Sequence, residues 1–207
     1  MQRVPVVRGY HGTSATQAAV IVRDGFRPSD NDYDCLGNGV YFFENGLVQA
    51  RTWAKRMHPS EPAVVQADIR LEDCLDLKDR LGWVPLLTRV HSELLRVSRQ
   101  QGRVLPRQTG DAHRLDHAVI ESTVAMLERE GMQVRAIRGV FAEGPPAFPG
   151  SFLNEGSHVQ VAVRDTDLIG NVKVVPAGAL GHRASAAGLD PEDAFERMRR
   201  HTRRRSC

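Results

Sequence analysis

The 207-residue sequence has few of the residues that build disulfide-stapled or membrane-bound proteins. It contains three cysteines, Cys35, Cys74 and Cys207, whose odd number and irregular spacing exclude a disulfide scaffold and give no zinc-ligand motif. No stretch approaches the ~18 apolar residues of a membrane helix, and Met1–Tyr10 lacks the apolar core of a signal peptide. These absences predict a cytoplasmic protein, or one delivered into a target cell's cytoplasm, without a membrane segment or a bound metal.

Lysine is equally scarce, because only three of the 28 Lys and Arg residues are lysines. The net charge is only +3, yet six arginines lie among the last eleven residues. Such a basic end is typical either of a solvated tail or of a segment that contacts nucleic acid or an acidic partner. The composition leaves both interpretations open.

The remaining composition is that of a folded domain, with 41% hydrophobic and 26% charged residues. Strand-like and helix-like segments are mixed without strict βαβ alternation, which favours an α+β fold over a doubly wound sheet. We predict one domain over residues 1–178, followed at 179–207 by a polar, Arg-rich tail with a short helix near Pro191.

Apolar spacing and turn residues predict the elements of this domain. A helix capped by Thr13 or Ser14 should end at Gly25, and Arg27–Gly39 and Glu143–Ser157 should be loops. Further helices are predicted at Leu47–Met57, Val84–Gln100 and Leu115–Glu130. Strands are predicted at Val4–Tyr10, Val40–Phe43, Ala63–Leu71, Cys74–Leu77, Val134–Ala142, His158–Arg164 and Asn171–Val175.

Three short blocks attract attention as candidate sites. The first is Tyr10-His11-Gly12-Thr13-Ser14, and the second is Leu36-Gly37-Asn38-Gly39-Val40-Tyr41-Phe42-Phe43. In the third, Ser157–Arg164, strand alternation places His158, Gln160 and Ala162 on one face and three valines on the other. Taken singly, the blocks also fit an ordinary turn, a core strand and a half-exposed surface strand.

In combination, these blocks resemble the catalytic core of ADP-ribosyltransferases of the diphtheria-toxin-like and poly(ADP-ribose)-polymerase-like branch. That branch has a His, Tyr and usually Glu triad, which His11, Tyr41 and Gln160 match in order. The segment after Tyr41, with Ala50 and Trp53, also resembles the family's helix under the nicotinamide pocket. The resemblance covers about residues 4 to 175 and implies a split antiparallel sheet with flanking helices.

The resemblance implies NAD as the substrate. In the family, the histidine bonds the nicotinamide ribose, the glycine backbone after it binds the carboxamide, and the tyrosine stacks on the nicotinamide. A glycine suits this place because no Cβ blocks the approach of a ligand. The resemblance thus assigns NAD binding to His11, Gly12, Thr13, Gly39, Tyr41 and Ala50.

Gln160 departs from the family pattern, which usually has glutamate at this position. A carboxylate about 4 Å from the developing sugar cation is worth about 4 kcal/mol at an effective dielectric near 20, whereas glutamine offers only a dipole and no general base. Gln160 either positions a ribose hydroxyl or marks a weak or dead enzyme. His158, on the same face, is the candidate acceptor-activating base, and its alternative role is a histidine merely hydrogen-bonded at a strand start.

The function expected from this resemblance is NAD-dependent mono-ADP-ribosyl transfer to a protein or nucleic-acid acceptor, with release of nicotinamide. Such small enzymes are known as bacterial toxins and defence effectors, and their loop corresponding to Gly144–Ser157 faces the acceptor. An NAD glycohydrolase and a silent NAD- or ADP-ribose-binding module are the alternatives. RNA 2′-phosphotransferases share the His-Gly-Thr block but lack the Gly-x-Gly-Val-Tyr-Phe pattern. The acceptor, the oligomeric state and any antitoxin-like partner stay open.

Overall fold

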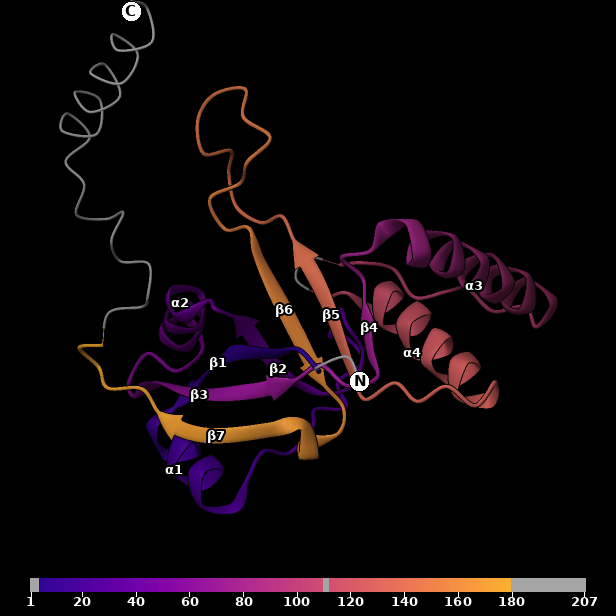
Figure 1. Ribbon diagram of the computed structural model, residues 1–207. Helices are drawn as coiled ribbons and strands as arrows, with labels where there is room; N and C mark the ends of the chain where they lie inside the picture. The colour runs from indigo at the N-terminus through magenta and orange to yellow at the C-terminus, as the bar shows by residue number, and fades with distance from the viewer. Residues whose placement is uncertain (1–3, 110–111, 180–207) are drawn as a thin grey trace, which may run out of the picture. The chain divides into compact units, whose positions relative to one another are not determined.

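The computed structural model describes residues 4–109 and 112–179 (Figure 1). The chain divides into two compact units, Met1–Val175 and Pro176–Cys207. All helices and strands of the described ranges belong to the first unit. The predicted tail beyond Ala179, including its arginines and the helix near Pro191, lies outside the described residues.

The first unit is built on a seven-stranded sheet with the order β4-β5-β6-β2-β1-β3-β7. Only β4 and β5 pair in parallel, and the other neighbours are antiparallel. The strands are β1 Val6–Ser14, β2 Val40–Glu44, β3 Pro62–Arg70, β4 Cys74–Asp76, β5 Ala136–Phe141, β6 His158–Val163 and β7 Ile169–Val174. The predicted α+β class is therefore confirmed.

Within the described residues, four α-helices accompany the sheet. They are α1 Ala15–Asp24, α2 Leu47–Met57, α3 Arg80–Gln100 and α4 Arg114–Arg129, and a 3₁₀ turn spans Thr166–Leu168. As predicted, the Ser14 side chain caps α1 by accepting from the Gln17 amide, and Gly25 follows the helix at φ +85°. No helix in the part of the chain that the structure describes is long and apolar enough to cross a membrane.

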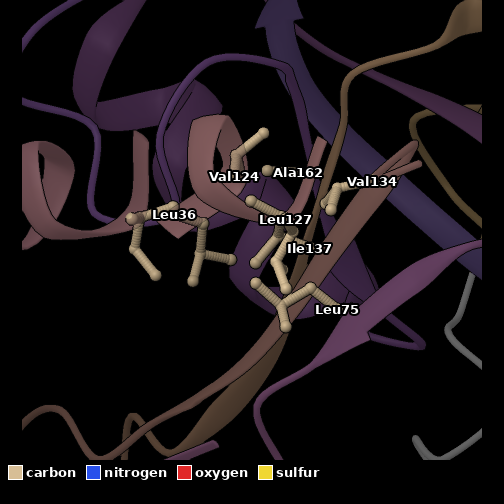
Figure 2. Close-up of a cluster of buried hydrophobic side chains, with 8 residues drawn as sticks. Leu36, Leu75, Val124, Leu127, Val134, Ile137 and Ala162 are labelled. Atoms are coloured by element: carbon tan, nitrogen blue, oxygen red, sulfur yellow. The ribbon is translucent and has the colours of Figure 1, made fainter. Parts of the chain in front are cut away.

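One face of the sheet, the α2/α4 face, carries two separate hydrophobic clusters. At one end α2 packs on β1 and β3 (Figure 1) through Tyr10, Leu47, Ala50 and Val64. At the other end α4 packs on β4, β5 and β6, and Figure 2 shows its cluster. The buried members of that cluster are Leu36, Leu75, Ile120, Val124, Leu127, Val134, Ile137 and Ala162.

The opposite face of the sheet is equally apolar. Phe42 of β2 and Val161 and Val163 of β6 are buried there with residues of β3, and Phe26 after α1 packs against them. Because Val161, Ala162 and Val163 are all buried, the polar face predicted for this strand is limited to its first half. The two polar residues of β6, His158 and Gln160, are partly exposed.

The pairing of β1 with β2 is short. These strands pair only at Gly9–Glu44 and Tyr10–Phe43, whereas β1 pairs with β3 from Val6 to Ser14. On its other edge, β2 pairs with β6 over Val40–Phe43. The pairing between the two central strands thus ends just before His11. It is the contact with β3 that extends β1 four residues beyond the predicted strand end at Tyr10.

Candidate functional site

His11 bridges β1 and β2 at the point where their pairing ends. Its Nδ1 lies 2.9 Å from the main-chain oxygen of Tyr41. A carbonyl oxygen can only accept, so Nδ1 carries the proton. Burial lowers the pKa of His11 and outweighs the raising effect of this hydrogen bond, which keeps the imidazole neutral. The other nitrogen, Nε2, is consequently left as a hydrogen-bond acceptor.

Besides the hydrogen bond to Tyr41, two aromatic rings hold the His11 ring. The ring centroid of Phe26 lies 5.5 Å away in an edge-on arrangement, and that of Phe42 lies 5.9 Å away. These contacts and the hydrogen bond to Tyr41 leave the imidazole little rotational freedom. His11 is therefore held in one orientation, with Nε2 as its acceptor.

Tyr41 meets His11 through its backbone, while its side chain faces the preceding loop. The hydroxyl donates to the Gly37 oxygen at 2.7 Å and accepts from the Leu36 amide at 2.9 Å. Its ring packs against the α4 cluster, and burial raises the pKa of the phenol, which stays neutral. The side chain therefore holds in place the Leu36–Gly39 segment, which we call the glycine loop. Its stacking on nicotinamide stays a prediction.

Gly12 is required by the packing of α2. A Cβ at this position would lie 2.4 Å from the Ala50 oxygen and 3.1 Å from the Ala54 nitrogen, both backbone atoms that cannot yield independently. Ala50 itself is completely buried, so its side chain packs in the core. The neighbour that requires a glycine here is thus a helix, whereas the sequence suggested the approach of a ligand.

Trp53, on the same turn of α2 as Ala50, lies beside Gly12. Its Cδ1 lies 3.2 Å from where a Gly12 Cβ would be, and 44% of the residue is exposed. The Arg56 guanidinium sits 5.8 Å over its ring. An exposed indole beside Gly12 offers a flat surface that a planar ligand can cover. The sequence placed Trp53 on this helix but assigned it no ligand contact, because its place beside Gly12 depends on how α2 packs.

Thr13 and Gly39 are the remaining residues assigned to NAD, and both are surrounded closely by other parts of the protein. Thr13 is buried on β1. Gly39 exchanges two main-chain hydrogen bonds with Ser29, both 3.0 Å, and a Cβ there would come within 3.0 Å of the Val163 oxygen. The structure explains both residues by packing, and their role toward NAD stays a prediction.

The glycine loop is fastened to α4 by a charged pair that the sequence argument missed. Glu121 accepts from the Asn38 amide at 2.8 Å and from Arg164 at 2.5 Å. Burial raises the pKa of Glu121, but the hydrogen bonds from Arg164 and Asn38 outweigh it, and the pKa is lowered. The pair is separated by more than 40 positions in sequence, so no local pattern indicates it.

Gln160 and His158 share the α2/α4 face with Phe43. Gln160 pairs with Phe43 of β2, which in turn pairs with Tyr10 of β1. Since adjacent strands lie about 4.8 Å apart, about 10 Å separates β1 from β6 at this level. A single dinucleotide can span that distance. The His11 ring, in contrast, contacts Phe42, whose side chain belongs to the opposite face.

One group of possible metal ligands lies outside this region. Sγ of Cys35, a ring nitrogen of His113 and a carboxylate oxygen of Asp116 all lie within 4.8 Å of one another. Burial and the nearby Asp116 raise the pKa of Cys35 to about 12, so the thiol stays protonated and donates to Asp116 at 3.6 Å. This hydrogen bond links the loop that precedes β2 to α4.

A surface hollow of about 490 Å³ lies between β4 and the ends of α3 and α4. It is lined by Leu75, Trp83, Leu127, Met132 and Val134 among others. None of the predicted site residues borders it. The hollow therefore contributes nothing to the chemistry of His11 and Gln160.

Neither a scan against models of protein families nor a search of curated proteins gave a match. The geometry brings His11, Gly12 and the Tyr41 backbone together where β1 and β2 part, and it places Gln160 and His158 two strands away.

Proposed function

We propose that this chain is an NAD-dependent mono-ADP-ribosyltransferase with an ADP-ribosyltransferase-like split sheet. The observation that carries the proposal is the end of β1–β2 pairing at Tyr10, with His11 reaching across to the Tyr41 carbonyl. Where two strands part, their facing backbone groups no longer pair with each other, and we infer that a ligand would bond to them there. Gln160, on the strand beyond β2, supplies a second polar group from the α2/α4 face, so a bound NAD would pass between β1 and β2 to reach both Gln160 and the His11 ring on the opposite face.

His11 would hold a ribose hydroxyl of NAD. Its Nε2 carries a lone pair because Nδ1 is protonated toward Tyr41, so a hydroxyl can donate to it. The lowered pKa keeps this acceptor available at neutral pH. Fixing the ribose in this way orients the glycosidic bond without any covalent step by the protein.

Trp53 and Gly12 would hold the nicotinamide. The exposed indole lies against the glycine, so a flat ring that stacks on Trp53 would come near the Gly12 backbone. Tyr41 is less suited to stacking, because its hydroxyl is engaged by Leu36 and Gly37. In this proposal Trp53, and not Tyr41 as the resemblance implied, stacks on the nicotinamide.

Gln160 would steady the sugar while the bond to nicotinamide breaks. The bond pair leaves with nicotinamide, and the ribose carbon takes on oxocarbenium character that the acceptor nucleophile then quenches. Glutamine provides a dipole and a hydroxyl contact but cannot remove a proton. Single transfer to an acceptor that needs no deprotonation by Gln160 fits this residue better than polymer formation.

The proposal is tested with NAD labelled in its adenylate phosphate, incubated with the full chain and a host-cell lysate. Label that protease removes identifies a protein acceptor, and label that nuclease removes identifies a nucleic acid. His11→Ala and Gln160→Ala should each lower nicotinamide release at least tenfold. His91→Ala, on α3, is the matched control and should leave release unchanged.

Other outcomes distinguish the alternatives. Free labelled ADP-ribose without transfer would indicate a glycohydrolase, and NAD binding without nicotinamide release would indicate a silent module. A chain that neither binds NAD nor releases nicotinamide contradicts the proposal. So does equal activity of the His11→Ala, Gln160→Ala and His91→Ala variants.

A further inference from the structure

The hydrogen bonds of His158 define which of its nitrogens carries the proton. Nδ1 lies 2.6 Å from the Gly156 main-chain oxygen. Because that oxygen has no proton to give, Nδ1 must be the donor. In the neutral ring the proton is then absent from Nε2, which becomes an acceptor.

Nε2 of His158 already has a partner. The side-chain nitrogen of Gln160 lies 2.7 Å from it. Only the amide nitrogen can donate to a lone pair, so this contact determines the orientation of the Gln160 amide: Nε2 toward the imidazole, Oε1 away from it. The chain of contacts runs from the Gly156 carbonyl through His158 to the amide.

The His158 ring is also clamped by two phenylalanines. Phe141 stacks on it at 5.6 Å with 15° between the planes, and Phe43 meets it edge-on at 5.0 Å. Phe141 and Phe43 come from β5 and β2, the two neighbours of β6. The ring is therefore fixed from both sides as well as at both nitrogens.

We propose that His158 is a positioning residue that holds Gln160 with its amide oxygen facing the substrate. This inference rests on the proposed function, in which Gln160 contacts a hydroxyl of NAD. It replaces the role of acceptor-activating base suggested by the sequence, since the lone pair that a base needs is engaged by Gln160. The catalytic contact then belongs to Gln160, and His158 acts through it.

Nitrogen-15 NMR of the full-length chain tests the orientation without any reaction. In the neutral form of His158, the long-range proton–nitrogen couplings should show a protonated Nδ1 and a bare Nε2. In His158→Asn, the side-chain NH₂ signals of Gln160 should shift. A proton on Nε2, or Gln160 signals unchanged by the substitution, would overturn the proposal whether or not the chain acts on NAD.

Two substitutions separate positioning from base catalysis in the NAD reaction. The asparagine of His158→Asn can replace the Nδ1 donor but not the Nε2 acceptor, whereas the glutamine of His158→Gln carries an amide oxygen that reaches the Nε2 place. We expect kcat for nicotinamide release to fall roughly tenfold in His158→Asn and less than threefold in His158→Gln, with KM for NAD little changed. Thermal melting of both variants reports whether they fold.

The base hypothesis makes the opposite forecast. If His158 takes a proton, both variants lose activity alike and both lose the histidine limb of the pH–rate profile. Equal loss in two folded variants therefore contradicts positioning, as does wild-type activity in both. A wild-type chain without nicotinamide release instead contradicts the proposed function, and the NMR result then decides the orientation of Gln160 alone.

Discussion

His11 combines a partly buried ring with a single protonated nitrogen, which makes it sensitive to pH. Burial lowers its pKa below the ordinary 6.5. Just below pH 6.5, His11 binds a proton in the unfolded chain but stays neutral in the folded chain. The folded state therefore loses stability as the pH falls through this range. The local environment of His11 thus couples the site to protein stability.

We predict that the free energy of unfolding of the wild type falls between pH 7.5 and pH 5, and that His11→Asn reduces this dependence. Asparagine has a side-chain nitrogen that can still donate to the Tyr41 oxygen, and it does not titrate. Urea unfolding at several pH values measures the effect. His91→Asn should keep the wild-type slope, and an unchanged slope in His11→Asn would show that His11 titrates normally.

Trp53 and Tyr41 should separate stability from ligand affinity. Tyr41→Phe removes a hydroxyl with two buried main-chain partners, which should cost about 1–3 kcal/mol of stability while folded protein keeps its NAD affinity. Trp53→Ala should do the reverse and weaken NAD binding about tenfold or more, because a stacking surface is lost.

Calorimetric melting and NAD titration of the same variants give both quantities. Tyr33→Phe, at an exposed tyrosine, and Val48→Ala, at an exposed position of α2, are the controls and should change neither. A Tyr41→Phe variant with wild-type stability but no NAD affinity would restore the tyrosine to the stacking role.

At the scale of elements, the contact between β1 and α2 is the tightest constraint on the site. The Gly12→Ala methyl group would collide with the backbone of Ala50, so α2 must move away from β1. Overpacking of this kind costs about 1–3 kcal/mol, and it would also displace Trp53.

We therefore predict that Gly12→Ala lowers both the unfolding midpoint in urea and the affinity for NAD. Gly170→Ala on β7 is the matched control, because its Cβ would meet only the Asp68 oxygen at 4.0 Å. Similar stability of the two variants would mean that α2 adjusts without strain.

At the scale of the whole molecule, the chain consists of the unit that carries all described elements and the segment from Pro176 onward. β7 pairs with β3 as far as Val174, and the Val175 amide still donates to Val64. A chain shortened to end at Ala179 keeps all these hydrogen bonds. The arginine cluster, in contrast, is removed.

The shortened chain should unfold cooperatively and bind NAD as the full chain does. If the arginines contact phosphates, acceptor modification should weaken and lose its dependence on salt concentration. Circular dichroism melting, NAD titration and transfer assays at several salt concentrations check these expectations. Loss of NAD binding on truncation would place part of the site beyond Ala179, and unchanged, salt-independent acceptor use would identify a solvated tail.

Much of the local structure follows from the sequence, because its causes are local. Ser14 and Gly25 bound α1 through a cap and a positive φ, and α2 has the predicted limits of Leu47 and Met57. Alternation in β6 correctly separates Ala162 from Val161 and Val163. Such signals need only neighbours within a few residues, so a single sequence contains them.

Long-range geometry alone decided which contacts each candidate residue makes. The sequence brought forward His11, Tyr41, Gln160 and His158, but the direction of the Tyr41 hydroxyl and the engaged lone pair of His158 depend on strand register and on the fold of the Leu36–Gly37 loop. The place of Trp53 beside Gly12 likewise depends on where α2 packs. Hydrogen bonds act over about 3 Å, so residues distant in sequence acquire their chemical roles only when the sheet is assembled.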